Sequence, residues 1–220
     1  MKRRAQLILF VKPARRGAVK TRLAREIGGA EAWAFYRRTV RRLLHRLGRD
    51  PRFRCVLAVP GGRRAALDPF WRVARVAVID QGRGDLGARM RRAFAGVPPG
   101  PALLIGGDIP GVRVSELRAA LHALGRAELV FGPAQDGGFW LVGLRRAGRR
   151  FRLFEKIAWS SPHTLNDVLA KLPDHVPVTF GSTLDDVDGA PAYQRAQDAE
   201  RRSRSMRHGM SSTRLQGRQR

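Results

Sequence analysis

The sequence predicts an α/β fold with three layers, in which helices cover both faces of a mostly parallel sheet. Apolar runs of strand length alternate with amphipathic helical patterns along most of the 220 residues, and this alternation is typical of parallel sheets covered by helices. Several apolar runs end in glycine or proline close to a carboxylate. Open α/β sheets bind their ligands outside the carboxyl ends of the strands, so these endings are the first places to look for a site.

Six apolar runs are expected to form strands: 6–11, 53–59, 75–79, 102–106, 128–132 and 139–144. The first run follows a basic N-terminus, but Lys12 and Pro13 stand where a signal peptide would have a small-residue cleavage site. We therefore interpret it as a buried strand. Between the first two runs, apolar residues at helical spacing face away from a row of arginines, which predicts an amphipathic helix: Trp33, Tyr36, Val40, Leu43, Leu44 and Leu47. Further helices are expected at 86–95, 114–124 and 163–172.

The length suits a single domain with a full core, which we expect to span residues 1–198. Residues 199–220 are rich in arginine and nearly free of apolar side chains. Such a segment has little to bury, so it is expected to be a disordered tail. The alternative is a tail that tethers the protein to RNA or to a membrane.

The composition excludes some classes of function and leaves others open. The formal net charge of +25 attracts nucleotides, nucleic acids and anionic membranes alike, so it identifies no partner. Nucleic acid is disfavoured as a partner because recognition motifs and interleaved aromatic residues are absent from the sequence. No run of about eighteen apolar residues is present, so no membrane span is expected. Cys55 is the only cysteine, which excludes a disulfide framework and fits a cytoplasmic protein. The oligomeric state stays open.

The run at 103–105 leads into Gly106, Gly107 and Asp108 and stops at Pro110. A carboxylate released at the carboxyl end of a strand can hold a divalent metal against a phosphate, and small glycines leave room for a ligand to approach the backbone. The alternative is an ordinary turn aspartate with its turn glycines.

The loop at 12–23 is basic, contains a glycine and leads into a helix, which favours phosphate binding. Lys12, Lys20 and Arg22, together with Arg15, are expected to neutralise a di- or triphosphate. A P-loop is excluded because Val19 stands where the glycine before the lysine must be. The alternative is a solvated basic loop.

A second loop, 82–90, follows the third predicted strand and opens a helix. Gly84, Asp85, Gly87 and Arg89 are expected to contact a nucleotide base or ribose. The alternative for Asp85 is a helix cap, since aspartate is a favoured residue at that position.

Two further acidic segments complete the predicted site. Asp136, followed by Gly137 and Gly138, is expected at the same edge as Asp108, where a carboxylate can act as a general base; the alternative is a type I′ hairpin turn. The segment 184–189 holds Asp185, Asp186 and Asp188. Asp108 and Asp188 are expected to bind Mg²⁺ or Mn²⁺, and the alternative is that Asp188 caps the next helix. The histidines show no metal-ligand spacing and no nucleophile triad can be proposed.

In their joint order these segments resemble the small bacterial arsenosugar-biosynthesis-type glycosyltransferases. That family has a GT-A-like, Rossmann-like nucleotide-diphospho-sugar transferase fold. The resemblance covers roughly residues 5–195 and rests on these motifs: Lys20-Thr21-Arg22-Leu23, Gly84-Asp85-Leu86-Gly87 with Arg89-Met90, Gly106 to Pro110, Gly132-Pro133-Ala134 with Asp136-Gly137-Gly138, Trp159-Ser160-Ser161-Pro162 and Asp186-Val187-Asp188. Many members carry Ser or Thr where this chain has Gly107, so hydroxyl contacts from that position are not expected here.

The resemblance implies a metal-dependent glycosyltransferase that moves a sugar from a nucleotide-activated donor to a small-molecule acceptor. In that interpretation Asp136 orients or deprotonates the acceptor hydroxyl, while Trp159, Ser160 and Ser161 line the acceptor side. One alternative keeps the fold but is a nucleotidyltransferase that consumes a nucleoside triphosphate and releases pyrophosphate. The other is a non-catalytic nucleic-acid-binding protein, for which the three site aspartates would be expendable.

Overall fold

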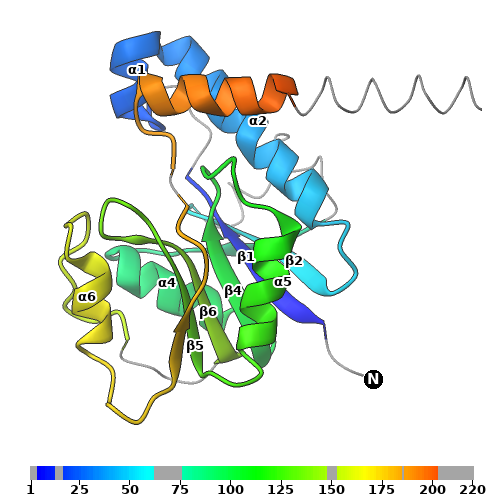
Figure 1. Ribbon diagram of the computed structural model, residues 1–220, viewed down its shortest axis with the longest axis vertical. Coiled ribbons are helices and arrows are strands. Elements are labelled where there is room, and N and C mark those ends of the chain that lie inside the picture. Colours follow the sequence, from blue (N-terminus) through cyan, green and yellow to red (C-terminus); the bar gives the residue numbers. More distant parts are fainter. Residues whose placement is uncertain (1–3, 13–16, 62–75, 148–152, 185, 203–220) are drawn as a thin grey trace, which may run out of the picture.

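A computed structural model describes residues 4–12, 17–61, 76–147, 153–184 and 186–202. These residues contain a seven-stranded sheet in the order β3-β2-β1-β4-β6-β5-β7 (Figure 1). The strands are β1 (Ala5–Phe10), β2 (Phe53–Val59), β3 (Ala77–Asp80), β4 (Gly100–Gly106), β5 (Leu129–Pro133), β6 (Phe139–Ala147) and β7 (Val178–Phe180). β6 runs antiparallel to both of its neighbours, and the other pairs are parallel. The prediction of a mostly parallel sheet is confirmed.

Helices cover both faces of this sheet, as predicted. They are α1 (Thr21–Ile27), α2 (Gly29–Leu47), α4 (Leu86–Ala95), α5 (Val114–Ala123), α6 (Thr164–Leu169) and a C-terminal helix at 190–202. Side chains of α2 and α5 share one hydrophobic cluster, and those of α4 and α6 share another. Leu7 and Leu9 of β1 join the first cluster, while Ile8 joins the second. β1 is therefore buried on both faces, which explains why its sequence is apolar without alternation.

The structure adds elements that the sequence pattern did not predict. α1 and β7 were not expected, and both are short. The C-terminal helix continues to residue 202, so the boundary predicted at 198 falls inside a helix. Residues 203–220, the remainder of the predicted tail, lie outside the described residues. In the part of the chain that the structure describes, no helix is both long and apolar enough to cross a membrane.

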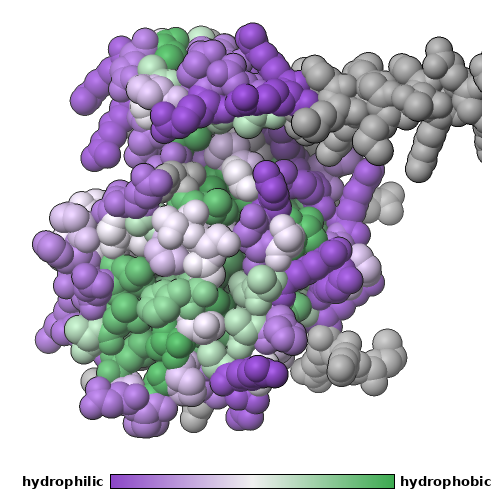
Figure 2. Space-filling model, viewed as in Figure 1, coloured by the Kyte–Doolittle hydropathy of each residue, from purple (hydrophilic) through white to green (hydrophobic). Residues whose placement is uncertain are grey.

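A third, smaller cluster joins the two ends of the domain. Leu23 of α1, Phe35 of α2, Val187 and Tyr193 pack together, and the rings of Phe35 and Tyr193 meet edge to face at 5.1 Å. In Figure 1 α1, the start of α2 and the C-terminal helix lie together above the sheet. Figure 2 shows hydrophilic residues over this upper part and hydrophobic residues below it, over the strands between α6 and α5.

Candidate functional site

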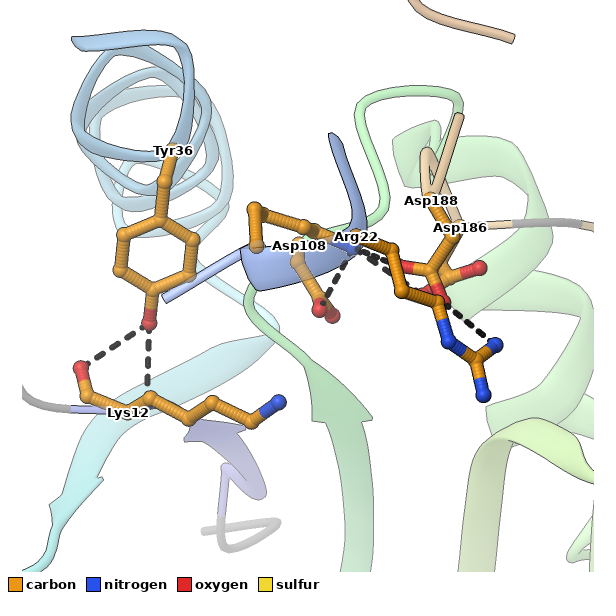
Figure 3. Close-up of polar contacts among 7 residues, drawn as sticks. Lys12, Arg22, Tyr36, Asp108, Asp186 and Asp188 are labelled. Carbon is orange, nitrogen blue, oxygen red and sulfur yellow. Dashed lines mark hydrogen bonds and ion pairs between the residues drawn. The ribbon is translucent and has the colours of Figure 1, made fainter. Parts of the chain in front are cut away.

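The ammonium of Lys20 lies at the centre of three carboxylates, and Figure 3 labels the aspartates that carry them. Its Nζ is 3.0 Å from Asp108 Oδ2, 3.0 Å from Asp186 Oδ2 and 2.9 Å from Asp188 Oδ1. The side chain of Lys20 is only 3% exposed, while those of the three aspartates are 24%, 40% and 46% exposed. We call these four residues the acidic cluster. It brings together Asp108 and Asp188, which the sequence analysis paired as metal ligands, and Lys20, which it assigned to phosphate binding.

The sheet explains why the cluster forms. β1 and β4 are parallel neighbours, so the Lys20 loop and Asp108 leave the sheet at the same edge. β7 lies at the far side of the sheet, and the chain after it returns across the strands. Along this segment the backbone carbonyl of Ser182 accepts a hydrogen bond from the indole N–H of Trp140, and the N–H of Leu184 donates to the carbonyl of Pro133. This return delivers Asp186 and Asp188 to Lys20.

Lys20 is held in an uncommon backbone conformation. Its φ of 50° and ψ of 46° are left-handed, a region that costs a residue other than glycine roughly 1–2 kcal/mol. Residues in such conformations persist where the surroundings fix them, and they gather at functional sites. Burial lowers the pKa of Lys20, but the charges of Asp108, Asp186 and Asp188 outweigh it, so its pKa lies above the ordinary value. The side chain is therefore a buried, permanent cation.

The pKa values of the two aspartates from the returning segment are shifted in opposite directions. Burial raises the pKa of Asp186 to about 6, although the charge of Lys20 opposes the rise. For Asp188 burial acts in the same direction, but Lys20 and the other partners hold its pKa below the ordinary value. Asp186 was not among the predicted site residues. The pattern around it could have revealed it, because alternate residues of an extended segment face the same side and Val187 between them is buried.

The donor set fits a hard divalent cation. Carboxylate oxygens are the ligands that Mg²⁺ and Mn²⁺ prefer, and three of them already surround one cationic atom. That atom is the Lys20 nitrogen. Within the described ranges, no group of three His, Cys, Asp or Glu side chains is arranged as a ready metal site. The oxygens of the acidic cluster are of the type that such an ion takes as ligands, and the ammonium lies among them.

Other basic residues of the first loop lie at the same edge. The Lys12 side chain is exposed, but its backbone is fixed: its N–H donates to the Tyr36 hydroxyl at 2.8 Å, and that hydroxyl donates to the Lys12 carbonyl at 3.0 Å (Figure 3). Burial and the nearby charge of Asp108 raise the pKa of Tyr36, so it remains a donor. Arg22 is 79% exposed, with Nη1 3.8 Å from Asp188 Oδ2. Arg15 lies outside the described residues.

The second predicted loop has clear local roles. Asp85 Oδ1 accepts a hydrogen bond of 2.7 Å from the N–H of Ala88 and caps α4, as the alternative interpretation expected. Gly87 leaves no room for a side chain, because the carbonyl of Phe154 lies where its Cβ would be. Gly84 has a φ of 104°, and Arg89 donates from Nε to the Asp85 carbonyl at 3.4 Å. A role in nucleotide binding stays a prediction for these four residues.

Asp136 lies in the turn between the antiparallel strands β5 and β6. The turn is a hairpin connection, but only Gly137 among its Asp-Gly-Gly residues has a positive φ, of 82°, so it is not type I′. Asp136 is exposed, and its Oδ1 accepts a hydrogen bond of 2.9 Å from the N–H of Gly138. Gly137 cannot carry a side chain because Pro162 lies against it. Asp136 is outside the acidic cluster, although β5 and β4 run in the same direction.

The predicted acceptor residues have packing and capping partners. Half-buried Trp159 lies beside Phe139 and Phe154, with ring centroids 6.4 and 6.2 Å away, and its indole nitrogen is buried without a hydrogen-bond partner. Exposed Ser160 has a φ of 63°. Ser161 Oγ accepts a hydrogen bond from the N–H of His163 at the start of α6. An acceptor role for these residues stays a prediction.

Two further predictions can be compared with the geometry. The N–H of Ala190, at the start of the C-terminal helix, donates to Glu26 Oε2 at 2.7 Å, whereas Asp188 faces Lys20. The departure from the family pattern at Gly107 has a steric reason. A Cβ at this position would lie 2.5 Å from Cγ1 of Val11, so this side chain, directly after β1, leaves no room for serine or threonine.

The fold is that of the nucleotidyltransferases and nucleotide-diphospho-sugar transferases. The chain belongs to the DUF2064 family, described as an uncharacterized protein conserved in bacteria, whose model matches residues 43–161. No curated protein matches the chain significantly.

Solved structures show the same fold. One from Desulfovibrio desulfuricans, provisionally named a nucleotide-diphospho-sugar transferase, is 27% identical over 85% of this chain and 84% of its own, with a TM-score of 0.73. The 4-diphosphocytidyl-2C-methyl-D-erythritol synthase of Anaerococcus prevotii is 9% identical over 90% of this chain and 96% of its own, with a TM-score of 0.60. A nucleotidyl transferase of Methanothermobacter is 16% identical over 90% of this chain and 98% of its own, with a TM-score of 0.59. The last two establish a shared fold alone.

Proposed function

We propose that the protein is a glycosyltransferase, which moves a sugar from a nucleotide-diphospho-sugar to a small-molecule acceptor. The observation that carries the proposal is the acidic cluster, with three carboxylates gathered beside a basic loop at one strand edge. Open α/β sheets bind ligands at this edge. The similarity to the provisionally named sugar transferase of Desulfovibrio desulfuricans supports sugar transfer.

The donor would be held through its phosphates. Exposed Lys12 and Arg22 flank the buried ammonium of Lys20, and together they provide the positive charge that a diphosphate needs. The loop that contains Gly84, Asp85, Gly87 and Arg89 would contact the base or the ribose. Its fixed glycine and cap geometry would hold that loop in place before the donor arrives.

Asp108 and Asp188, assisted by Asp186, would hold Mg²⁺ or Mn²⁺ at the same edge. A divalent cation bound there would neutralise the negative charge that develops on the leaving diphosphate. Lys20 and Arg22 would hold the phosphate oxygens in place as that charge develops.

Asp136 would take the proton from the acceptor hydroxyl. It is exposed, and its bond to the N–H of Gly138 orients the carboxylate. A positioned general base accelerates such a step by about 10²–10⁴-fold. Gly137, Gly138, Trp159, Ser160 and Ser161 would surround the acceptor.

A nucleotidyltransferase is the second candidate. The shared fold with the Anaerococcus prevotii and Methanothermobacter enzymes supports it. In that reaction the protein would consume a nucleoside triphosphate and release pyrophosphate. A glycosyltransferase would release a nucleoside diphosphate, so the leaving group separates the two.

The test is a product assay with Mn²⁺ and a panel of nucleotide sugars, nucleoside triphosphates and sugar or hydroxyl acceptors. We expect nucleoside diphosphate release from one donor. Asp108→Asn is expected to lower the rate about 10²-fold or more, while Asp174→Asn, at an exposed position outside the predicted site, is the matched control and should not. Full activity in Asp108→Asn would contradict the role of the acidic cluster, and pyrophosphate release would select the second candidate.

A further inference from the structure

We propose that Lys20 is a tethered cation that fills the metal position until a phosphate-bearing ligand draws it away. The divalent cation and the nucleotide would then bind as a pair rather than separately. The inference rests on the proposed cation site and adds an order of assembly to it. Lys20 is thus a positioning residue that changes partners from carboxylate to phosphate.

The ammonium of Lys20 occupies the position that a divalent ion would need. Its nitrogen lies within 3.0 Å of one oxygen from each of the three aspartates, so a divalent ion that uses these oxygens must take the same space. A metal cannot enter beside Lys20 without strong repulsion between two cations at contact distance. Binding of the ion therefore requires the lysine to leave.

Lys20 can leave the carboxylates only if another anion accepts its ammonium. Its side chain is 3% exposed, and a buried ammonium without an anionic partner is costly. Leaving the carboxylates is favourable only when another anion accepts the charge. Exposed Arg22, beside Asp188, and exposed Lys12 are placed to attract phosphate to this edge, which would supply that anion.

Two features distinguish the acidic cluster from a purely structural ion pair. Asp186 and Asp188 are 40% and 46% exposed on their side chains, so a cation from solvent can reach the carboxylates while Lys20 approaches them from the protein side. Lys20 also keeps a left-handed backbone, which a stabilising surface pair would not need. Both features fit an exchange of partners.

The experiment measures the binding of Mn²⁺ alone at pH 8. Binding is followed by the decrease in the electron paramagnetic resonance signal of unbound Mn²⁺. Wild type is compared with Lys20→Met, with Lys20→Gln and with Lys171→Met. The glutamine variant keeps an N–H donor for the carboxylates and serves if the methionine variant does not fold. Lys171 is exposed and controls for the loss of one positive charge from a strongly basic protein.

We expect both Lys20 variants to bind Mn²⁺ at least tenfold more tightly than wild type, and Lys171→Met to resemble wild type. Adding Asp108→Asn to Lys20→Gln should abolish the gain. Thermal unfolding at a fixed free Mn²⁺ concentration provides the second measurement. In wild type, Mn²⁺ and pyrophosphate together should raise the unfolding temperature by more than the sum of the increases that each produces alone. In Lys20→Gln the increase with both ligands should equal that sum.

Three outcomes are distinguishable. Equal or weaker Mn²⁺ binding by the Lys20 variants overturns the exchange. If wild type in that case still binds Mn²⁺ and Asp108→Asn does not, the proposed cation site stands although the exchange of Lys20 is wrong. If no protein binds Mn²⁺, with or without pyrophosphate, the cation site falls and the exchange falls with it.

Discussion

Gly107 sets how closely the end of β4 approaches the end of β1 beside Asp108. A Cβ there would lie 2.5 Å from Cγ1 of Val11, which is itself 2% exposed and cannot move aside. We expect Gly107→Ser to lower the free energy of unfolding by about 1–3 kcal/mol through overpacking, measured by urea denaturation. Gly111→Ser, where no atom lies within 4 Å of an added Cβ, is the control and should change stability by less than about 0.5 kcal/mol. Equal losses would contradict the clash.

Asp186 should give the protein a pH dependence of stability. Its pKa is raised from 3.8 to about 6 in the folded chain, so between these values the folded state binds more protons than the unfolded state. Stability from this residue therefore falls as pH rises through that window. We expect the free energy of unfolding of Asp186→Asn to rise relative to that of wild type as pH rises from about 4 to about 6. Above about pH 6 the difference between the two proteins should stay constant. Urea denaturation at each pH measures it. A constant difference at every pH would contradict the raised pKa.

The sequence predicted the acidic cluster in part. Asp108, Asp188 and Lys20 could be found because each follows or precedes a strand or a helix in a recognisable pattern. Asp186 was missed, although its alternation with buried Val187 was available. That Lys20 would lie among the carboxylates could not be predicted, because it is separated from Asp186 by 166 positions. The contact depends on how the chain after β7 returns across the sheet.

The C-terminal helix at 190–202 ties the carboxylate segment to the front of α2. Tyr193 packs its ring on Phe35 and donates its hydroxyl to Glu31 Oε1 at 2.8 Å, in the same cluster as Val187. The same hydroxyl accepts a hydrogen bond from Nε2 of Gln197. We expect Tyr193→Phe to lose about 0.5–1.5 kcal/mol, since the hydroxyl and its hydrogen bonds are removed while the ring stays. Tyr193→Ala should lose about 3–5 kcal/mol and bind Mn²⁺ more weakly. The two variants are compared by urea denaturation and Mn²⁺ titration, and similar losses in both would show that the ring contributes little.

The sequence predicted long elements better than short ones. β1, β2 and β4 are mostly buried and each carries an apolar run, so their limits were close to those observed. β7 has three residues, two of them half-buried and one exposed, and too few positions to show a period. α1 has seven residues and one buried side chain. Its existence depends on packing against α2 and Val187 rather than on its own pattern.

The net charge of +25 should produce binding to polyanions that is separate from the acidic cluster. We expect wild type to bind a single-stranded RNA with an affinity that falls steeply as salt rises, because such binding is driven by release of counterions. Asp108→Asn should bind the RNA as well as wild type does, whereas its Mn²⁺ binding should be lost. Both are measured by titration at several salt concentrations. RNA binding that required Asp108, Asp136 or Asp188 would instead favour nucleic acid as the ligand of the site.

The antiparallel placement of β6 between β4 and β5 affects the order in which the molecule can fold. β5 and β6 are joined by a short hairpin, so they can pair early and locally. β1 must wait for β4, which lies far along the chain, and pairing of distant segments carries a larger loop-closure cost. The acidic cluster needs that late pairing and also the return of the chain after β7. A nascent or partly folded chain therefore lacks the proposed cation site, which forms only when folding is complete.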